Sequence, residues 1–213
     1  AEILRIHQKM SKAQALAKAL ELLTEVQIPD PEARLNQYPH QLSGGQRQRV
    51  MIAMALANSP DVLIADEPTT ALDVTVQAEI LNLIKALKEK NGMAVILITH
   101  DLTVVRQFAD HVYVMQHGEV REEGPTEAIF GNPQHAYTKR LLGSEPTGQA
   151  NALTGTPETV LEGRDIRVTY RLRKGGAFRG TWTGLQAVDG LSLALKRGET
   201  LGLVGESGSG KTT

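Results

Sequence analysis

One stretch of sequence decides the fold: LSGGQRQRVMIAMALANSPDVLIADEPTTALD, residues 42–73. Ser43 precedes two glycines and is placed to cap a helix, and the helical pattern that follows stops at Pro60. The apolar run at 62–65 is short and continuous, which is typical of a parallel strand buried on both faces. The stretch therefore predicts a capped helix followed by a buried strand.

A carboxylate pair, Asp66–Glu67, comes directly after this predicted strand. The carboxyl ends of parallel strands form the rim of a sheet at which ligands bind. Asp66 is suited to hold Mg²⁺ through water, and Glu67 is suited to orient an attacking water as a base. Taken alone, the pair could equally be a solvated acidic end of a strand.

The sequence after the pair predicts a βαβ unit. A helix is expected over 73–89, and Asn91-Gly92 breaks it before a second apolar run, AVILIT, at 94–99. The predicted inward face of the helix consists of Val76, Ile80, Leu83, Ile84 and Leu87. Two buried strands joined by a helix predict an α/β fold with a parallel sheet.

Further helices and a hairpin are expected around this unit. Residues 11–26 predict a helix whose apolar face is Ala13, Leu16, Leu20 and Leu23. The helix after Gly44-Gly45 is predicted to follow a pattern through Met51, Met54, Ala55 and Asn58. Alternating residues on either side of His117-Gly118 predict an antiparallel hairpin.

The composition changes after residue 142. Residues 143–157 are rich in Gly, Pro, Ser and Thr, which predicts a linker. Beyond it we expect an exposed basic loop at 171–184 and an apolar strand at 200–204. Short β-like runs are predicted at 159–161, 166–170, 186–188 and 191–195.

The loop GESGSGKT at 205–212 matches the pattern GxxxxGK[ST] directly after a predicted strand. Glycines in this context let backbone N–H groups turn inward and cradle phosphates, with Lys211 reaching the β- and γ-phosphates and Thr212 ligating Mg²⁺. The candidate ATP-binding residues here are Gly205, Glu206, Ser207, Gly208, Ser209, Gly210, Lys211, Thr212 and Thr213.

Other candidates are less specific when taken singly. Ser43, Gly44, Gly45 and Gln46 open a helix whose bare N–H groups attract anions, although they also suit an ordinary capped helix. His100 follows the strand at 94–99 and could bond a γ-phosphate, or it could be structural. Tyr170 could stack on adenine, or it could simply pack. The other histidines show no metal-ligand spacing.

Composition excludes several classes of protein. The chain has 213 residues, a net charge of −1 and no cysteine, so it has no disulfide framework and no thiolate chemistry. The balanced charge does not favour nucleic-acid binding. No apolar run approaches the roughly 20 residues that a membrane span needs, and the first residues are unlike a signal peptide. Both ends have the character of cut ends, since Lys211-Thr212-Thr213 lies inside a motif that should open a helix.

The motifs together resemble the ATP-binding cassette (ABC) ATPases. LSGGQ at 42–46 is similar to the family's signature, VLIADE at 62–67 to its Walker B, and TALD at 70–73, ending in Asp73, to its D-loop. GESGSGKT at 205–212 is similar to Walker A. His100 takes the place of the switch histidine and Tyr170 that of the adenine-stacking aromatic. The resemblance implies the cofactors ATP and Mg²⁺ and the catalytic residues Glu67 and His100.

The order of the motifs implies parts of two cassettes. Residues 1–142 resemble the back of a first cassette, 143–157 a linker, and 158–213 the front of a second cassette ending in Walker A. The segment NPQHAYT at 132–138 resembles the C-terminal extension of importers for di- and oligopeptides, nickel and glutathione, although that branch usually has Pro at Ala136.

The resemblance implies an ATP-hydrolysing subunit that drives import of peptides or related small solutes from the cytoplasmic face of the inner membrane. Its implied partners are permease subunits, a solute-binding protein and a second cassette in cis, and no nucleic acid is expected. The 213 residues alone are expected to be inactive. Alternatives are a non-transport cassette ATPase, a P-loop kinase or GTPase, and a fragment that only binds nucleotide or a partner; the block from LSGGQ to TALD is unlike a kinase or GTPase.

Overall fold

The computed structural model describes residues 1–70, 72–144, 155–174, 181–205 and 209–213. The chain divides into two compact units, Ala1–Pro146 and Thr147–Thr213, and each unit is described by itself. Most of the linker predicted at 143–157 lies outside the described residues. No described helix is long and apolar enough to cross a membrane.

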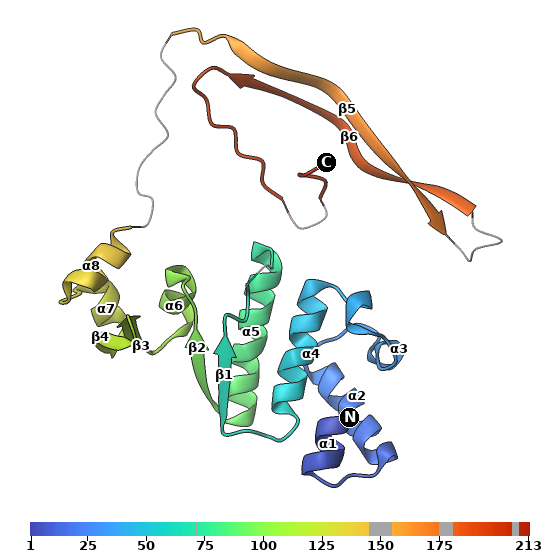
Figure 1. Ribbon diagram of the computed structural model, residues 1–213, viewed down its shortest axis with the longest axis vertical. Helices are drawn as coiled ribbons and strands as arrows, with labels where there is room; N and C mark the ends of the chain where they lie inside the picture. The colour runs from blue at the N-terminus through green and yellow to red at the C-terminus, as the bar shows by residue number, and fades with distance from the viewer. Residues whose placement is uncertain (71, 145–154, 175–180, 206–208) are drawn as a thin grey trace. The chain divides into compact units, whose positions relative to one another are not determined.

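The first unit mixes helices with two small sheets (Figure 1). Its elements, in order, are α1 (Glu2–His7), α2 (Lys12–Glu25), α3 (Pro31–Arg34), the 3₁₀ helix η1 (Pro39–Gln41), α4 (Gly44–Leu56), β1 (Val62–Asp66), α5 (Val74–Asn91), β2 (Ala94–Ile98), α6 (Leu102–Phe108), β3 (His111–Gln116), β4 (Glu119–Pro125), α7 (Thr126–Gly131) and α8 (Ala136–Leu142).

The predicted βαβ unit is confirmed. β1 and β2 pair in parallel, in a register that runs from Val62 opposite Ala94 to Asp66 opposite Ile98. α5 connects them and ends at Gly92, which adopts the left-handed conformation with φ 63°. The predicted inward face of α5 is also confirmed, because its buried residues are Ile80, Leu81, Leu83, Ile84 and Leu87, with Val76 packed against the same core.

The prediction that β1 is buried on both faces is wrong for this structure. Leu63 and Ala65 belong to the core that α2, α4 and α5 share, whereas Val62 and Ile64 on the opposite face are exposed. Ile96 and Ile98 of β2 are exposed as well. A run of apolar residues shows only that a strand is able to be buried on both faces. Within the described residues, other elements cover only one face of this sheet.

Two predicted helix faces are also corrected. α2 buries Ala15 and Leu22, while Leu16 of the predicted face is exposed. α4 buries Ile52, Ala53 and Leu56, while Met51 and Met54 are exposed. Both helices carry apolar residues on more than one side, so spacing alone did not identify the side that packs. The two helices pack against each other, and together with α5 they form the core.

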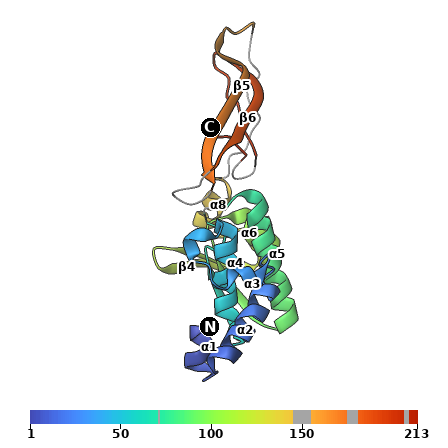
Figure 2. The same cartoon turned by 90° about the vertical axis from the view of Figure 1, so that its right-hand side faces the viewer.

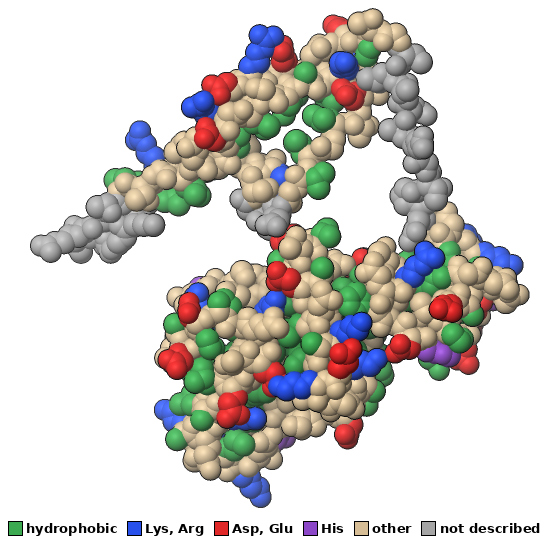
Figure 3. Space-filling model, turned by 180° about the vertical axis from the view of Figure 1, so that it is seen from behind, with side chains coloured by type: hydrophobic (Ala, Val, Ile, Leu, Met, Phe, Trp, Pro, Cys, Tyr) green, Lys and Arg blue, Asp and Glu red, His purple; other side chains and the backbone are tan. Residues whose placement is uncertain are grey.

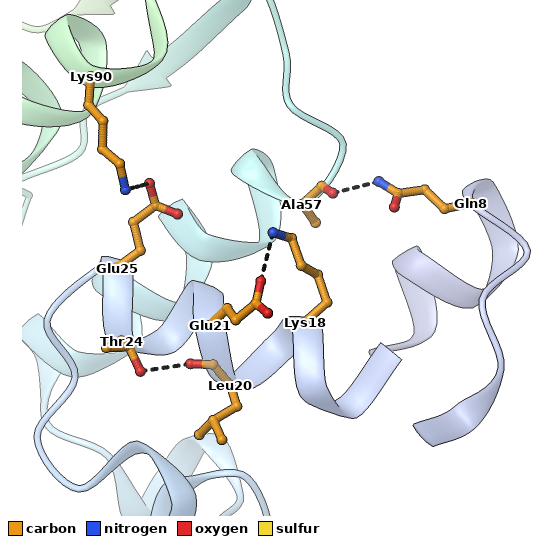
Figure 4. A network of polar contacts seen from close by, with 8 residues as sticks. All are labelled: Gln8, Lys18, Leu20, Glu21, Thr24, Glu25, Ala57 and Lys90. Carbon is orange, nitrogen blue, oxygen red and sulfur yellow. Dashed lines mark hydrogen bonds and ion pairs between the residues drawn. The ribbon is translucent and has the colours of Figure 1, made fainter. Parts of the chain in front are cut away.

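Polar contacts fasten α1 and α2 to the rest of the first unit (Figure 4). The Lys90 ammonium at the end of α5 lies 2.7 Å from the Glu25 carboxylate at the end of α2. The Gln8 amide donates to the Ala57 carbonyl at 2.8 Å. These contacts hold the amino-terminal helices against α4 and α5.

The predicted hairpin at His117-Gly118 is confirmed as β3 and β4. His117 has φ 54° and Gly118 has φ 79°, the pair of left-handed residues that a two-residue hairpin turn requires. Glu122 of β4 accepts hydrogen bonds from the backbone N–H groups of Gln134 and His135, at 2.7 and 3.0 Å. One carboxylate thereby holds the start of α8 against the hairpin.

The second unit is a long antiparallel hairpin of β5 (Thr159–Lys174) and β6 (Thr181–Lys196), whose strands run side by side (Figure 2). The predicted short runs thus merge into two strands with several shifts of register. The basic loop predicted at 171–184 is wrong at both ends, because 171–174 continue β5 and 181–184 begin β6, and the residues between them lie outside the described part of the chain. Hydrophobic side chains, including Trp182 and Leu185, are exposed on this hairpin, and its exposed apolar surface is visible in Figure 3.

The strand predicted at 200–204 is not present. These residues have no regular structure, and Leu201, Leu203 and Val204 are exposed, Val204 to 97%. A strand is stable only when its backbone groups pair with a neighbour, and within the described residues no strand pairs with this segment.

Candidate functional site

The candidate catalytic residues of the first unit gather at one edge of the parallel sheet. β1 ends at Asp66 and β2 ends at Ile98, and these two residues lie opposite each other in the register. Glu67 and His100 follow the two strands, so both project from the carboxyl-terminal edge, as the sequence predicts. Asp66 is exposed at this edge, where its carboxylate is accessible to a hydrated cation.

Glu67 is fixed through both its backbone and its side chain. Its backbone adopts the left-handed region with φ 44°, and its N–H donates to the Ile98 carbonyl at 2.8 Å. One carboxylate oxygen, Oε1, lies 3.1 Å from His100 Nδ1. The other, Oε2, accepts a hydrogen bond of 2.7 Å from the Thr70 hydroxyl. The bonds from Thr70 and then His100 lower the pKa of Glu67, so its ionised form is favoured.

A second contact links the loop after β2 to α5. Asp101 caps α6 by accepting from the N–H groups of Thr103 and Val104, and it also accepts from the Gln77 amide at 3.1 Å. Burial opposes the charged form of Asp101, but the hydrogen bonds from Gln77, Val104 and Thr103 and the nearby His100 outweigh it and lower the pKa. The loop that carries His100 is thus anchored to the first turns of α5.

The LSGGQ residues form a capped helix start. Ser43 and Gln46 make a reciprocal capping box, with the Ser43 hydroxyl accepting from the Gln46 N–H and the Gln46 side chain accepting from the Ser43 N–H. A Cβ atom added to Gly44 would lie 3.2 Å from Leu72, and one added to Gly45 would lie 2.6 Å from Val76. The small residues therefore let α4 begin directly against the residues that open α5.

Asp73 of the predicted D-loop is the N-cap residue of α5. Its carboxylate accepts from the Val76 N–H at 3.0 Å and caps α5. The local contacts of Ser43 and Asp73 are those of helix caps, which is also what an ordinary capped helix would show.

The predicted phosphate-binding loop belongs to the second unit. Glu206, Ser207 and Gly208 lie outside the described residues. The Lys211 ammonium donates to the Gly205 carbonyl at 2.6 Å and lies 3.5 Å from the Ser209 hydroxyl. Gly210 has φ 87°, and a Cβ atom there would clash with the Ala187 carbonyl oxygen, so the position requires glycine. Thr212 and Thr213 end this exposed turn.

Tyr170 lies on β5, opposite Leu185 of β6, and its side chain is half exposed. In the structure it is neither buried in a core nor stacked on another ring among the described aromatic pairs. About half of its side-chain surface is therefore accessible from solvent. Within the described residues no group of three or more His, Cys, Asp or Glu side chains could hold a metal ion.

Sequence reasoning missed Thr70 and Gln77 as polar partners of this site. Thr70 was assigned only to the TALD segment, and Gln77 was treated as part of a helix. The position of Thr70 carried a signal, because it lies three residues after Glu67, whereas Gln77 lies 24 residues before Asp101 and its spacing gives no local signal. Neither spacing names the atom to which the side chain binds.

Comparisons with known proteins agree with these motifs. A family sequence model described as "ABC transporter" matches residues 2–70. The peptidoglycan transport ATP-binding protein YejF of Agrobacterium fabrum is 55% identical over 212 residues, an alignment that covers 100% of this chain and 39% of that protein. This chain belongs to the ABC transporter family of ATP-binding proteins.

Two further relatives support this ABC assignment. The glutathione import ATP-binding protein GsiA of Salmonella choleraesuis is 48% identical over 240 residues, covering 100% of this chain and 38% of GsiA. The solved structure of cbiO1 from Clostridium perfringens, described as part of the ABC transporter complex cbiONQ, has a TM-score of 0.52 and 32% identity. It covers 60% of this chain and 49% of its own. The chain thus spans less than half the length of the curated relatives that it matches, and the predicted α/β cassette fold and importer resemblance are confirmed.

Proposed function

We propose that this chain is part of the ATP-hydrolysing subunit of an ABC importer for peptides or related small solutes. The observation that carries the proposal is the Glu67 carboxylate at the rim of the parallel sheet, which is 3.1 Å from His100 and also accepts a hydrogen bond from the Thr70 hydroxyl. The relatives named for peptidoglycan transport and glutathione import support an importer over a non-transport ATPase.

In this proposal Glu67 orients the attacking water and His100 contacts the transferred phosphoryl group. ATP with Mg²⁺ supplies the phosphoanhydride bond whose hydrolysis is coupled to transport. The chain's residues suit this cofactor, because Gly210 forms a turn that only glycine can make, beside a lysine and two threonine hydroxyls. Lys211 neutralises phosphate charge and Thr212 provides an oxygen atom for Mg²⁺ at one ATP site, where Tyr170 offers a face for adenine, whereas Asp66 holds Mg²⁺ through water at the other site.

The candidate residues are proposed to serve more than one ATP site of the full-length subunit. Gly205–Thr213 are proposed to bind the phosphates at one site. Asp66, Glu67, Asp73 and His100 are proposed to serve the other site, and the LSGGQ residues Ser43, Gly44, Gly45 and Gln46 are proposed to contact nucleotide as part of the first cassette. The division into 1–142 and 158–213 as parts of two cassettes is a proposal that rests on the order of the motifs.

The proposed setting is the cytoplasmic face of the inner membrane. The subunit binds there as a peripheral protein to integral-membrane permeases, which a solute-binding protein loads, and a second cassette lies in the same polypeptide. The chain's net charge of −1 does not favour nucleic acid as a partner.

The test is Glu67→Gln in the full-length subunit that carries this sequence, assembled with its permeases. We expect phosphate release at that site to fall about 10²–10⁴-fold because the water loses its base, while ATP stays bound. Glu89→Gln, which changes an exposed glutamate on α5, is the matched control. Undiminished phosphate release by Glu67→Gln would contradict the proposed role.

A further inference from the structure

The Glu67 carboxylate is held from two sides by different kinds of group. The Thr70 hydroxyl donates to Oε2 at 2.7 Å, and His100 Nδ1 lies 3.1 Å from Oε1. His100 is 80% exposed at its side chain, so it has room to turn toward a ligand. When His100 makes such a contact, the Thr70 hydroxyl remains as the group that fixes the carboxylate.

The backbone explains why Thr70 reaches Glu67. The Thr70 N–H donates to the Glu67 carbonyl at 3.2 Å, which closes a turn that contains the buried Pro68. This turn brings residue 70 close to residue 67. The branched side chain of threonine also restricts the rotamers of its hydroxyl group. The main-chain bond and the side-chain bond therefore run between the same two residues.

The left-handed backbone of Glu67 also limits where its side chain can lie. With φ 44° and its N–H bound to Ile98, the main chain sets the direction in which the side chain leaves the strand. A glutamate still has several rotatable bonds beyond its Cα atom, and an exposed carboxylate without a partner samples many rotamers. The hydrogen bond from the Thr70 hydroxyl to Oε2 restricts that freedom.

We propose that Thr70 is a positioning residue for Glu67, whose hydroxyl holds the carboxylate in the orientation needed to direct a water at the sheet rim. This inference rests on the proposed function of Glu67. Misplacement of a catalytic group by about 1 Å costs rate without weakening substrate binding in proportion. Thr70 thus acts on turnover through Glu67, without itself contacting the nucleotide.

The experiment compares Thr70→Val, Thr70→Ser and the control Thr75→Val in the full-length subunit assembled with its permeases. Thr75 is an exposed residue in the first turn of α5. We expect Thr70→Val to lower kcat about tenfold with KM for ATP changed by less than about twofold, because it removes an interaction that acts on the reacting geometry alone. Thr70→Ser keeps the hydroxyl and should restore most of kcat.

Two outcomes would overturn the inference: Thr70→Val with an unchanged kcat, or Thr70→Ser as slow as Thr70→Val. An unchanged kcat accompanied by a rise in KM would place Thr70 in nucleotide binding. Glu67→Gln is measured in the same assay. If Glu67→Gln is inactive while Thr70→Val is normal, only this inference fails, whereas an active Glu67→Gln contradicts the proposed function itself. Melting temperatures and ATP binding show that each variant is folded.

Discussion

Arg49 is the residue on which three helices of the first unit converge. It lies on α4, is only 9% exposed, and donates to the Val26 carbonyl at the end of α2 at 3.1 Å. Its other nitrogen lies 2.9 Å from the Glu79 carboxylate on α5. A buried guanidinium needs partners for its charge and its N–H groups, and here the backbone and a carboxylate supply them.

We predict that Arg49→Met lowers the free energy of unfolding by about 2–3 kcal/mol, because it removes charged hydrogen bonds and leaves the Val26 carbonyl unpaired. Urea denaturation of the variant measures the loss. Arg47→Met, two residues earlier on the same helix and exposed, is the control and should change stability by less than about 0.5 kcal/mol. Equal stability of the two variants would show that the Arg49 contacts contribute little.

The sequence predicted the chemistry of single residues better than their contacts. Glu67 and His100 were expected at the sheet rim, and the strand ends place them there. The bonds of Thr70 to Glu67 and of Arg49 to Val26 were not expected. The first bond depends on where a turn closes, and the second depends on where a helix crosses its neighbour. A local pattern of apolar and polar residues predicts neither position.

Glu122 connects two elements, β4 and α8, through a single carboxylate. Hydrogen bonds from the Gln134 N–H and the His135 N–H lower the pKa of Glu122 below its ordinary value of 4.5. Because the folded pKa is lowered, the stabilisation is present above the ordinary pKa and is lost as the pH falls through the folded pKa. The contact therefore contributes at neutral pH and disappears in acid.

We predict that Glu122→Gln is less stable than the natural chain at neutral pH and that the difference vanishes in acid. The two N–H groups bond to different oxygens of the carboxylate, whereas a neutral amide has one acceptor oxygen and can keep only one of these bonds, without the charge that strengthens it. Thermal melts across an acidic to neutral pH series measure this difference. Glu123→Gln, an exposed neighbour on the same strand, is the control. A difference between Glu122→Gln and the natural chain that persists in acid would contradict the assignment to the charged carboxylate.

Elements with a strong local pattern were predicted well. α5, β1, β2 and the hairpin of β3 and β4 were all expected, since caps, breakers and turn glycines mark their ends. The burial of β1 and the strand at 200–204 were predicted wrongly. Both depend on neighbouring elements that cover a face or pair with an edge, and the pattern of a segment does not show whether those neighbours are present.

At the scale of the whole molecule, the proposed chemistry is divided between the two units. The first unit holds Glu67, His100 and the LSGGQ helix, and the second holds Lys211 and Tyr170. The motifs and the family could be predicted from the sequence, because each motif is short and has a required context. The assignment of the motifs to two ATP sites stays a prediction, because it concerns how cassettes face each other.

Phosphoryl transfer needs the lysine, the metal and the water-orienting group at one phosphate together. If Lys211 and Glu67 serve different sites, the 213-residue chain alone holds no complete set. A chain that carries both groups but cannot bring them to one phosphate should fold and still hydrolyse ATP very slowly.

The most direct measurement is phosphate release by the purified, monomeric 213-residue chain with ATP and Mg²⁺, compared with a full-length subunit that carries the same sequence. Circular dichroism first shows that the chain is folded. We predict release close to the rate without protein, and clear turnover by the full-length subunit. Robust hydrolysis by the monomeric chain, abolished by Glu67→Gln and by Lys211→Ala alike, would place both residues at one site and contradict this account.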